Sequence, residues 1–118
     1  MNHLKNSVQL IGNVGKAPEF RQLEGGRMMT RFSLATNESY RNGRGQEITD
    51  TQWHSVVAWG KLAENMGKML RKGSAVVIRG KLQHSSYENA EGLRRYVSQV
   101  VVNEFMVLNK GDREGSIP

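Results

Sequence analysis

The sequence predicts an all-β domain with one short helix, an OB-fold: a five-stranded Greek-key β-barrel with the helix between strands 3 and 4. Three observations support this fold class. Apolar residues alternate with polar ones in several short runs, a single stretch has helical spacing, and the order contains no βαβ repeat. At 118 residues the chain suits one domain of average size. An SH3-like barrel or a small sandwich would lack a helix at this place.

Three strands are expected before the helix. Residues 8–14 alternate between apolar and polar side chains, and the run stops at GKAP. A second alternating run covers residues 28–36, after a Gly-Gly turn signal, and a third covers roughly residues 50–59. The polar stretch YRNGRGQEIT between the last two runs contains two glycines and two arginines. This composition predicts a long, mobile hairpin arm.

The period changes after Gly60, where a short amphipathic helix is expected. Four apolar residues fall at helical spacing, namely Leu62, Met66, Met69 and Leu70. Glu64 and Lys68 form an i, i+4 pair of opposite charge. The sequence Arg71-Lys72-Gly73 then favours a helix C-terminus, because cations and glycine are both preferred there.

Two strands are expected after the helix. Residues 75–83 alternate again, with Val76, Ile78 and Leu82 on the core face. A turn at residues 89–92 leads into residues 94–108, which form one long strand or one strand bent into another. We therefore expect residues 1–108 to form the OB-fold domain. Residues 109–118 have the composition of a disordered C-terminal tail.

The composition limits the classes of partner and chemistry. There are 17 Lys and Arg residues against 11 Asp and Glu, a formal charge of +6. This charge favours an anionic partner, and nucleic acid, an acidic protein and a membrane surface all fit. The absence of cysteine excludes disulfides, thiolate chemistry and Cys-based zinc sites. Without a secretory signal or a bilayer-spanning run, we expect a cytoplasmic protein that does not contact membranes.

Trp53 and Trp59 lie six positions apart in the third strand, so both indoles point to the same side of the sheet. If they point inward, His54, Val56 and Ala58 form the outer face; if they point outward, these three residues face the core. In neither assignment is one face of the strand purely apolar and the other purely polar. Large aromatic side chains are usually buried, which favours the core.

Neighbouring residues favour the opposite, outward assignment. The fourth strand has a clean core face, while its other face carries Arg79 and Lys81 and leads to Tyr87. Tyr40 lies at the root of the arginine-bearing arm, where a core aromatic would be poorly placed. Aromatic rings interleaved with Lys and Arg form stacking platforms beside a cationic groove, a combination that binds unpaired bases and their phosphates.

The sequence gives little support for a catalytic site or a metal site. His3, His54 and His84 have no metal-ligand spacing, and no cysteine is available, so neither a metal nor another cofactor is expected. Nothing marks a nucleophile elbow or an acid–base pair. The expected protein is not an enzyme.

Over residues 4 to about 108 the chain resembles bacterial single-stranded DNA-binding proteins of the homotetrameric type. The matching stretches are VQLIGNVGKAPEFR, FSLATNESYR, TQWHSVVAWGKLAENMGKMLRKGSAVVIRGKL and RRYVSQVVVNEFMVL. The family stacks bases on four aromatic positions, and the matching residues here are Tyr40, Trp53, Trp59 and Tyr87. Two of these positions are often tryptophan in relatives and are tyrosine here.

The resemblance also implies residues for backbone contacts and assembly. Basic positions that fit the family's contacts to the DNA backbone are Arg21, Lys61, Arg71 and Lys72. Charge and strand parity add Arg41, Arg79, Lys81, Arg94 and Arg95. His54 matches a position that the family uses at a subunit interface, although most lone histidines are satisfied structural residues.

The resemblance implies sequence-independent binding of single-stranded DNA by a homotetramer in replication, recombination and repair, in the cytoplasm at the nucleoid. Relatives usually end in a glycine-rich linker and an acidic tip that recruits replication and repair proteins. The sequence here ends at GDREGSIP without such a tip, which leaves recruitment of these partners open. The alternative is an OB-fold RNA-binding or primosome-type accessory protein, because stacking and basic charge do not separate DNA from RNA. A module that binds a partner helix is a third possibility.

Overall fold

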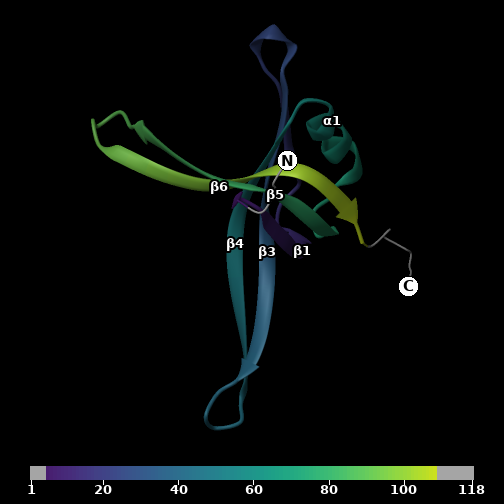
Figure 1. Ribbon diagram of the computed structural model, residues 1–118, viewed down its shortest axis with the longest axis vertical. Helices are drawn as coiled ribbons and strands as arrows, with labels where there is room; N and C mark the ends of the chain where they lie inside the picture. Colours follow the sequence, from purple (N-terminus) through teal and green to yellow (C-terminus); the bar gives the residue numbers. More distant parts are fainter. Residues whose placement is uncertain (1–4, 109–118) are drawn as a thin grey trace.

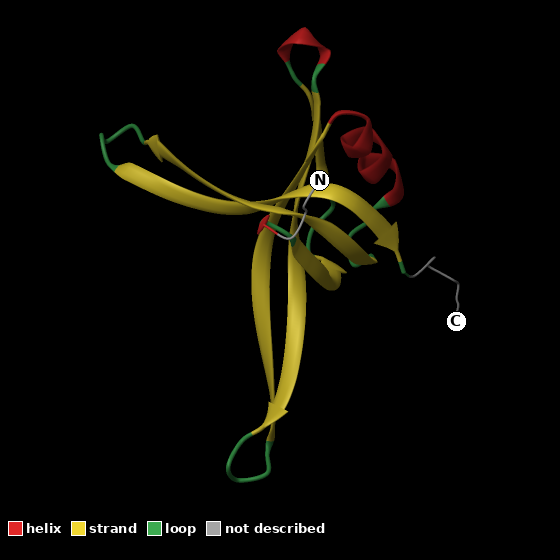
Figure 2. Cartoon of the chain, viewed as in Figure 1, coloured by secondary structure: helices red, strands yellow, loops and turns green. Residues whose placement is uncertain are grey.

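The computed structural model describes residues 5–108, which form six strands and one α-helix (Figures 1 and 2). In chain order the elements are β1 (Val8–Val14), β2 (Glu19–Gln22), a 3-10 turn η2 (Glu24–Gly26), β3 (Met28–Arg41), β4 (Glu47–Trp59), α1 (Gly60–Met69), β5 (Ala75–Glu88) and β6 (Arg94–Val107). The helix lies between β4 and β5 and covers one end of the barrel. The predicted tail, residues 109–118, lies outside the described residues.

Five of the strands close into a barrel, as the sequence predicted. The sheet order is β1-β5-β6-β4-β3-β2, and an additional pairing of β1 with β3 closes the circle. The β4–β6 pairing is parallel and the other pairings are antiparallel. Gly12 permits the closure, because a Cβ atom there would clash with the carbonyl oxygen of Ala35 in β3. The remaining strand, β2, lies outside the barrel circle, pairs only with β3 and was not predicted.

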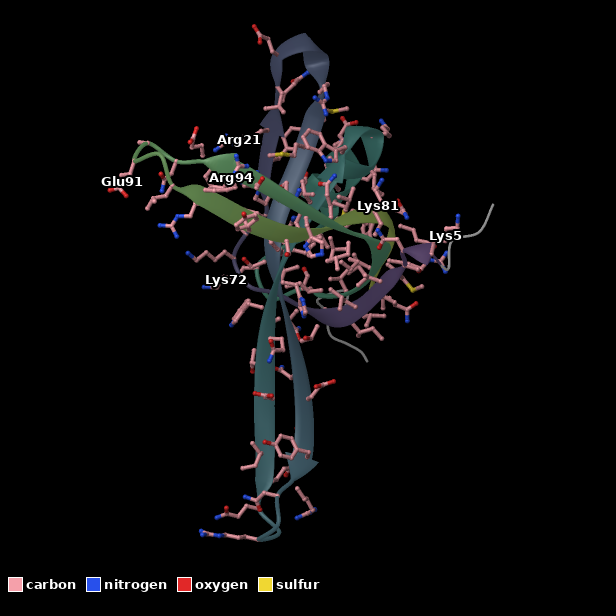
Figure 3. The ribbon with its side chains drawn as sticks, turned by 60° about the vertical axis from the view of Figure 1, so that its left-hand side comes forward. Lys5, Arg21, Lys72, Lys81, Glu91 and Arg94 are labelled. Atoms are coloured by element: carbon pink, nitrogen blue, oxygen red, sulfur yellow. The ribbon has the colours of Figure 1, made fainter. Side chains whose placement is uncertain are left out.

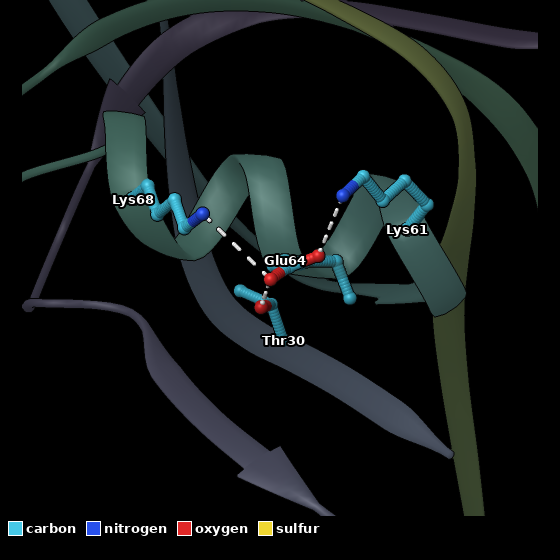
Figure 4. Close-up of polar contacts among 5 residues, drawn as sticks. Thr30, Lys61, Glu64 and Lys68 are labelled. Carbon is cyan, nitrogen blue, oxygen red and sulfur yellow. Dashed lines mark hydrogen bonds and ion pairs between the residues drawn. The ribbon is translucent and has the colours of Figure 1, made fainter. Parts of the chain in front are cut away.

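The core is one cluster of apolar side chains inside the barrel and under α1. Its fully buried members include Leu34 of β3, Val56 of β4 and Met66 of α1. Thr30 is also fully buried and donates a hydrogen bond from Oγ1 to the carbonyl oxygen of Ala63, at 2.6 Å (Figure 4). This bond attaches the first half of α1 to β3 and satisfies a polar group inside the core.

The exposed side of α1 carries the predicted ion pair. Glu64 lies 3.0 Å from Lys61 Nζ and 3.7 Å from Lys68 Nζ (Figure 4). The hydrogen bond and charge of Lys61, with a smaller contribution from Lys68, hold the pKa of the Glu64 carboxyl below its usual range. Met69 was placed on the apolar face of this helix, and that placement is wrong. It is the last helical residue and is exposed, while Leu70 after it is buried.

The strands extend beyond the barrel as two long hairpin arms (Figure 1). The predicted hairpin arm between the second and third strands is present: β3 and β4 pair from Met29 and Trp59 to Arg41 and Glu47, and only residues 42–46 form the turn. The remaining turn is ordered by Asn42, whose side chain accepts bonds from the backbone N–H groups of Arg44 and Gln46. The second arm consists of the outer halves of β5 and β6.

Leu82 was predicted to lie on the core face of the fourth strand, and that prediction is wrong. It has the parity of Val76 and Ile78 but lies where β5 leaves the barrel, so its side chain is exposed rather than part of the core. The final strand is a single strand, β6, with a register shift opposite Arg79 and Gly80. At this shift Asn103 is the extra residue, because Arg79 pairs with Glu104 and Gly80 pairs with Val102.

Candidate nucleic-acid interface

Both tryptophans point away from the core. Trp53 is 62% exposed and Trp59 is 36% exposed, whereas Val56 and Ala58, on the opposite parity of β4, are fully buried. The outward assignment is therefore confirmed. Val57 has the parity of the tryptophans but is buried, because it lies between Arg31 of β3 and Val101 of β6. Because β4 carries buried residues on both of its faces, the alternation of its sequence did not show which face points to the core.

Basic residues from neighbouring strands share the outer face with the tryptophans. Directly paired residues of adjacent strands lie on the same face of a sheet. One such row runs from Arg31 through Val57 and Val101 to Lys81, and so crosses four strands. A second row places Arg21 of β2 beside Met29 and Trp59. We call this surface, with Trp53, Trp59, Arg21, Arg31 and Lys81, the tryptophan face.

Trp59 lies at the rim of this face, where the chain turns from β4 into α1. Gly60 makes the turn with a φ of 71°, a left-handed conformation that favours glycine. The guanidinium carbon of Arg27 lies 4.5 Å from the centroid of the Trp59 ring. This cation–π contact covers part of one indole face and brings a positive charge to the ring.

Trp53 lies at the other end of the face, over the start of the loop that follows β1. A Cβ atom at Gly15 would lie 2.6 Å from Cζ3 of Trp53, so the ring rests directly on this glycine. The adjacent Val14 carbonyl accepts a hydrogen bond of 2.8 Å from the backbone N–H of Gly73. That bond brings the turn that carries Arg71 and Lys72 to the same end of β1.

The contact between Gly15 and Trp53 gives a test of the indole's position. In a Trp59→Phe background, Gly15→Ala is expected to displace the Trp53 ring and increase its exposure, because the new methyl group occupies the ring's place. Tryptophan emission should shift to longer wavelength and acrylamide quenching should increase, with little change in Tm. Gly43→Ala is the matched control, because a Cβ there has open space around it. An unchanged spectrum in Gly15→Ala would show that the ring does not rest on Gly15.

The two predicted tyrosines lie on different arms. Tyr87 of β5 is exposed and pairs with Arg95 of β6. It has the same parity as Lys81, so the tryptophan face continues along one side of the β5–β6 arm. Tyr40 of β3 is exposed as well, but it pairs with Ile48, whose parity is opposite to that of Trp53. The structure therefore brings Tyr87 to the side of the tryptophan face and places Tyr40 on the other side of the β3–β4 ribbon.

The predicted basic residues differ in how their charges are balanced. Three are paired with carboxylates: Arg21 with Glu19 at 2.6 Å, Lys61 with Glu64 at 3.0 Å, and Arg79 with Glu104. Arg41 and Arg71 donate to backbone carbonyls, of Gly45 and Lys68. Figure 3 shows that Arg21, Lys72, Lys81 and Arg94 extend from four separate segments of the chain. Arg94 lies on the arm face opposite to Arg95, where it donates to Ser86 Oγ at 3.0 Å.

His54 has a partner within its own chain. It is half-buried on β4, and its Nε2 lies 2.9 Å from Thr36 Oγ1 of β3. Within residues 5–108, no group of three His, Cys, Asp or Glu side chains could hold a metal ion. In the same part of the chain, no helix is long and apolar enough to cross a membrane.

Three residues that bear on nucleic-acid binding were missed from the sequence: one on the tryptophan face, one against Trp59 and one on the β5–β6 arm. Arg31 could have been found, because it alternates with the core residues Thr30 and Phe32. Arg27 could not, since it precedes β3 and reaches Trp59 only through the fold. Tyr96 of β6 is the third tyrosine and is 78% exposed.

Comparison with known proteins gives one consistent result. The model of the Single-strand binding protein family matches residues 5–108. A single-stranded DNA-binding protein of Neisseria meningitidis is 35% identical over 114 residues, which is 96% of this chain and 66% of that protein. One of Xanthomonas campestris is 39% identical over 93% of this chain and 63% of its own length.

Solved structures agree with these relatives. The Plasmodium falciparum SSB complex with ssDNA superposes with a TM-score of 0.80 at 29% identity, over 88% of this chain and 95% of that chain. A deletion mutant of the single-stranded DNA-binding protein from Thermus aquaticus gives a TM-score of 0.78 at 28% identity, over 89% of this chain and 51% of that chain. The chain thus spans about two thirds of the length of the curated relatives described above.

Proposed function

Because the chain belongs to the single-strand binding protein family, we propose that it binds single-stranded DNA without sequence preference and protects it in replication, recombination and repair. The observation that carries this proposal is the outward exposure of Trp53 and Trp59 on a surface lined by arginine and lysine. A protein with this role works in the cytoplasm, at the nucleoid, where single strands are exposed.

The mechanism divides into a stacking part and a charge part. Bases stack on Trp53 and Trp59, and every base has a π-face, so this contact is independent of sequence. Arg31 and Lys81 attract phosphates, which releases counterions and makes the affinity fall with salt. Duplex bases are already stacked on one another and do not offer their faces. Selectivity for single strands follows from the stacking part.

The remaining predicted residues receive roles according to their place. Tyr87 extends the stacking surface along the β5–β6 arm, and Tyr40 offers a separate platform on the β3–β4 arm. Besides Arg31, the basic residues proposed to contact the DNA backbone are those predicted from the sequence: Arg21, Arg41, Lys61, Arg71, Lys72, Arg79, Lys81, Arg94 and Arg95. Those already paired with a carboxylate add less net charge than the unpaired ones.

Binding of a labelled oligo(dT), followed by fluorescence anisotropy, tests this function. We expect tight binding at low salt, weak binding of a duplex of equal length, and recovery of the DNA unchanged after incubation. Neither stacking nor charge reads the 2′-OH, so oligo(rU) is compared directly, and tighter binding of oligo(rU) than of oligo(dT) would favour the RNA-binding alternative. Failure to bind oligo(dT) at low salt would overturn the proposal.

We further propose that the protein acts as a homotetramer, with the outer face of β1, β5 and β6 in contact with another copy. Ile11, Val77 and Met106 form one apolar row across these strands, and Ile11 and Met106 are more than half exposed. In β1 only Asn13 and Val14 pair with β3, and residues 8–12 pair with β5 alone among the described residues. The other edge of residues 8–12 is therefore available to a second copy. His54 is proposed to support an interface from β4.

A charge placed in the apolar row is expected to weaken the assembly. Met106→Glu should lower the native mass, measured by light scattering at fixed protein concentration, because a carboxylate is costly to bury between two copies. Met69→Glu is the matched control, because Met69 is similarly exposed on α1, away from the row. An unchanged mass in Met106→Glu would exclude this face as the interface.

A further inference from the structure

We propose that Tyr96 and Arg94 form a second contact surface for single-stranded DNA, on the face of the β5–β6 arm opposite to Tyr87. The proposal rests on the proposed function and adds a fifth aromatic ring to the four predicted from the sequence. It makes the arm a two-sided element that the strand contacts on both faces.

The geometry of the arm separates the two faces. From Gly80 to Glu88, β5 pairs with β6 without interruption, from Val102 to Arg94. Tyr87 pairs with Arg95 on one face, and Tyr96 pairs with Ser86 on the other. The arm extends away from the barrel, as the green ribbon at the left of Figure 1 shows. Every residue from Gln83 to Glu88 of β5 is exposed, so both faces of the arm are open along this outer part.

Tyr96 is exposed to an extent that packing within the chain does not explain. At 78% it is the most exposed of the large apolar and aromatic side chains in the described residues. A tyrosine ring in this state offers an apolar surface to water and gains from covering it. A flat partner of similar size, such as a base, covers such a ring at low conformational cost.

The residues around the ring are held by hydrogen bonds. Arg94, two positions before Tyr96 on the same face, donates to Ser86 Oγ, directly across from the ring. On the other side, His84 Nδ1 lies 2.7 Å from Ser98 Oγ. These bonds hold the side chains on both sides of Tyr96, so the neighbours of the ring need little reordering when a base stacks there.

Charge on this face supports a nucleic acid as the occupant. Arg94 and Arg95 are consecutive, so strand alternation puts one guanidinium on each face of the arm. Glu88 pairs with Arg94 in the register and is the acidic residue on the Tyr96 face of the arm. The Arg94 side chain is nevertheless directed to Ser86, beside the ring, where it can also meet a phosphate. Each face thus combines one tyrosine with one arginine.

The test is the affinity of the full chain for a long oligo(dT), with Tyr96 replaced. We expect Tyr96→Ala to lower the affinity about 5- to 150-fold, the range for losing one stacked base, and Tyr96→Phe to retain it. Leu93→Ala is the matched control, because Leu93 is an exposed apolar residue of the same arm without a π-face. A Tyr87→Ala/Tyr96→Ala double variant should lose the product of the two single effects, since the rings lie on separate faces.

Other outcomes overturn the proposal without overturning the function. If Tyr96→Ala binds like the wild type while Trp53→Ala binds weakly, the tryptophan face binds DNA and the Tyr96 face does not. If Tyr96→Ala lowers the native mass and leaves the affinity of the assembled protein unchanged, Tyr96 contacts another copy instead. Should Tyr96→Ala fail to fold, Tyr96→Leu decides, because it keeps apolar bulk and removes the π-face.

Discussion

Trp53→Ala is expected to weaken binding of single-stranded DNA by about 1–3 kcal/mol, roughly 5- to 150-fold, while the domain keeps its fold. The ring is 62% exposed and lies outside the core cluster, so its removal leaves no internal cavity. What is lost is a flat surface on which a base can stack. Trp59→Ala is expected to lose a similar amount.

Anisotropy with oligo(dT) measures the affinity, and thermal unfolding measures stability under the same conditions. Gln52→Ala is the control, because Gln52 is an exposed neighbour on the opposite side of β4. Loss of folding cooperativity in Trp53→Ala, with normal affinity in the folded fraction, would assign the indole to the core instead.

Leu34→Ala should have the converse effect and lower the free energy of unfolding by about 2–5 kcal/mol. Leu34 is fully buried in β3, paired with His54, and its side chain fills the interior of the barrel. Removing it loses apolar burial and leaves a cavity that the closed barrel cannot fully collapse. Chemical denaturation at fixed protein concentration measures this loss.

The affinity for oligo(dT) distinguishes Leu34→Ala from Trp53→Ala. Where Leu34→Ala is folded, it should bind oligo(dT) with nearly wild-type affinity, because the tryptophan face is intact. Leu93→Ala, which shortens an exposed leucine, is the control and should change stability little. A Leu34→Ala protein of normal stability would contradict the barrel interior described above.

Much of the barrel could be predicted because its strands alternate strongly. The order of elements and the position of the helix follow from periodicity alone. Strand β2 was missed because its four residues are all exposed and show no alternation; it exists only because β3 provides a partner. Leu82 and Met69 were misplaced for different reasons. Leu82 has the parity of the core residues, but β5 leaves the barrel before it. Met69 is the last residue of α1 and is exposed, and the residue that reaches the core is Leu70 after it.

The site was less predictable, since its parts meet only through the register. The outward direction of the tryptophans was ambiguous from parity, because Val57 on the same side is also buried. No spacing in the sequence indicates that Tyr40 and Trp53 fall on opposite sides of one ribbon. The ion pair of Arg79 with Glu104 joins residues 25 positions apart, so the charge balance was hidden as well.

The central claim, that exposed indoles serve as base platforms, is tested most directly by tryptophan fluorescence during titration with poly(dT). We expect strong, saturable quenching at low salt, because stacked bases contact both rings, and recovery of emission as salt is raised. Trp53→Phe and Trp59→Phe variants would assign the quenching to each ring. Emission that stays unchanged at low salt, in folded protein at saturating poly(dT), would contradict the claim.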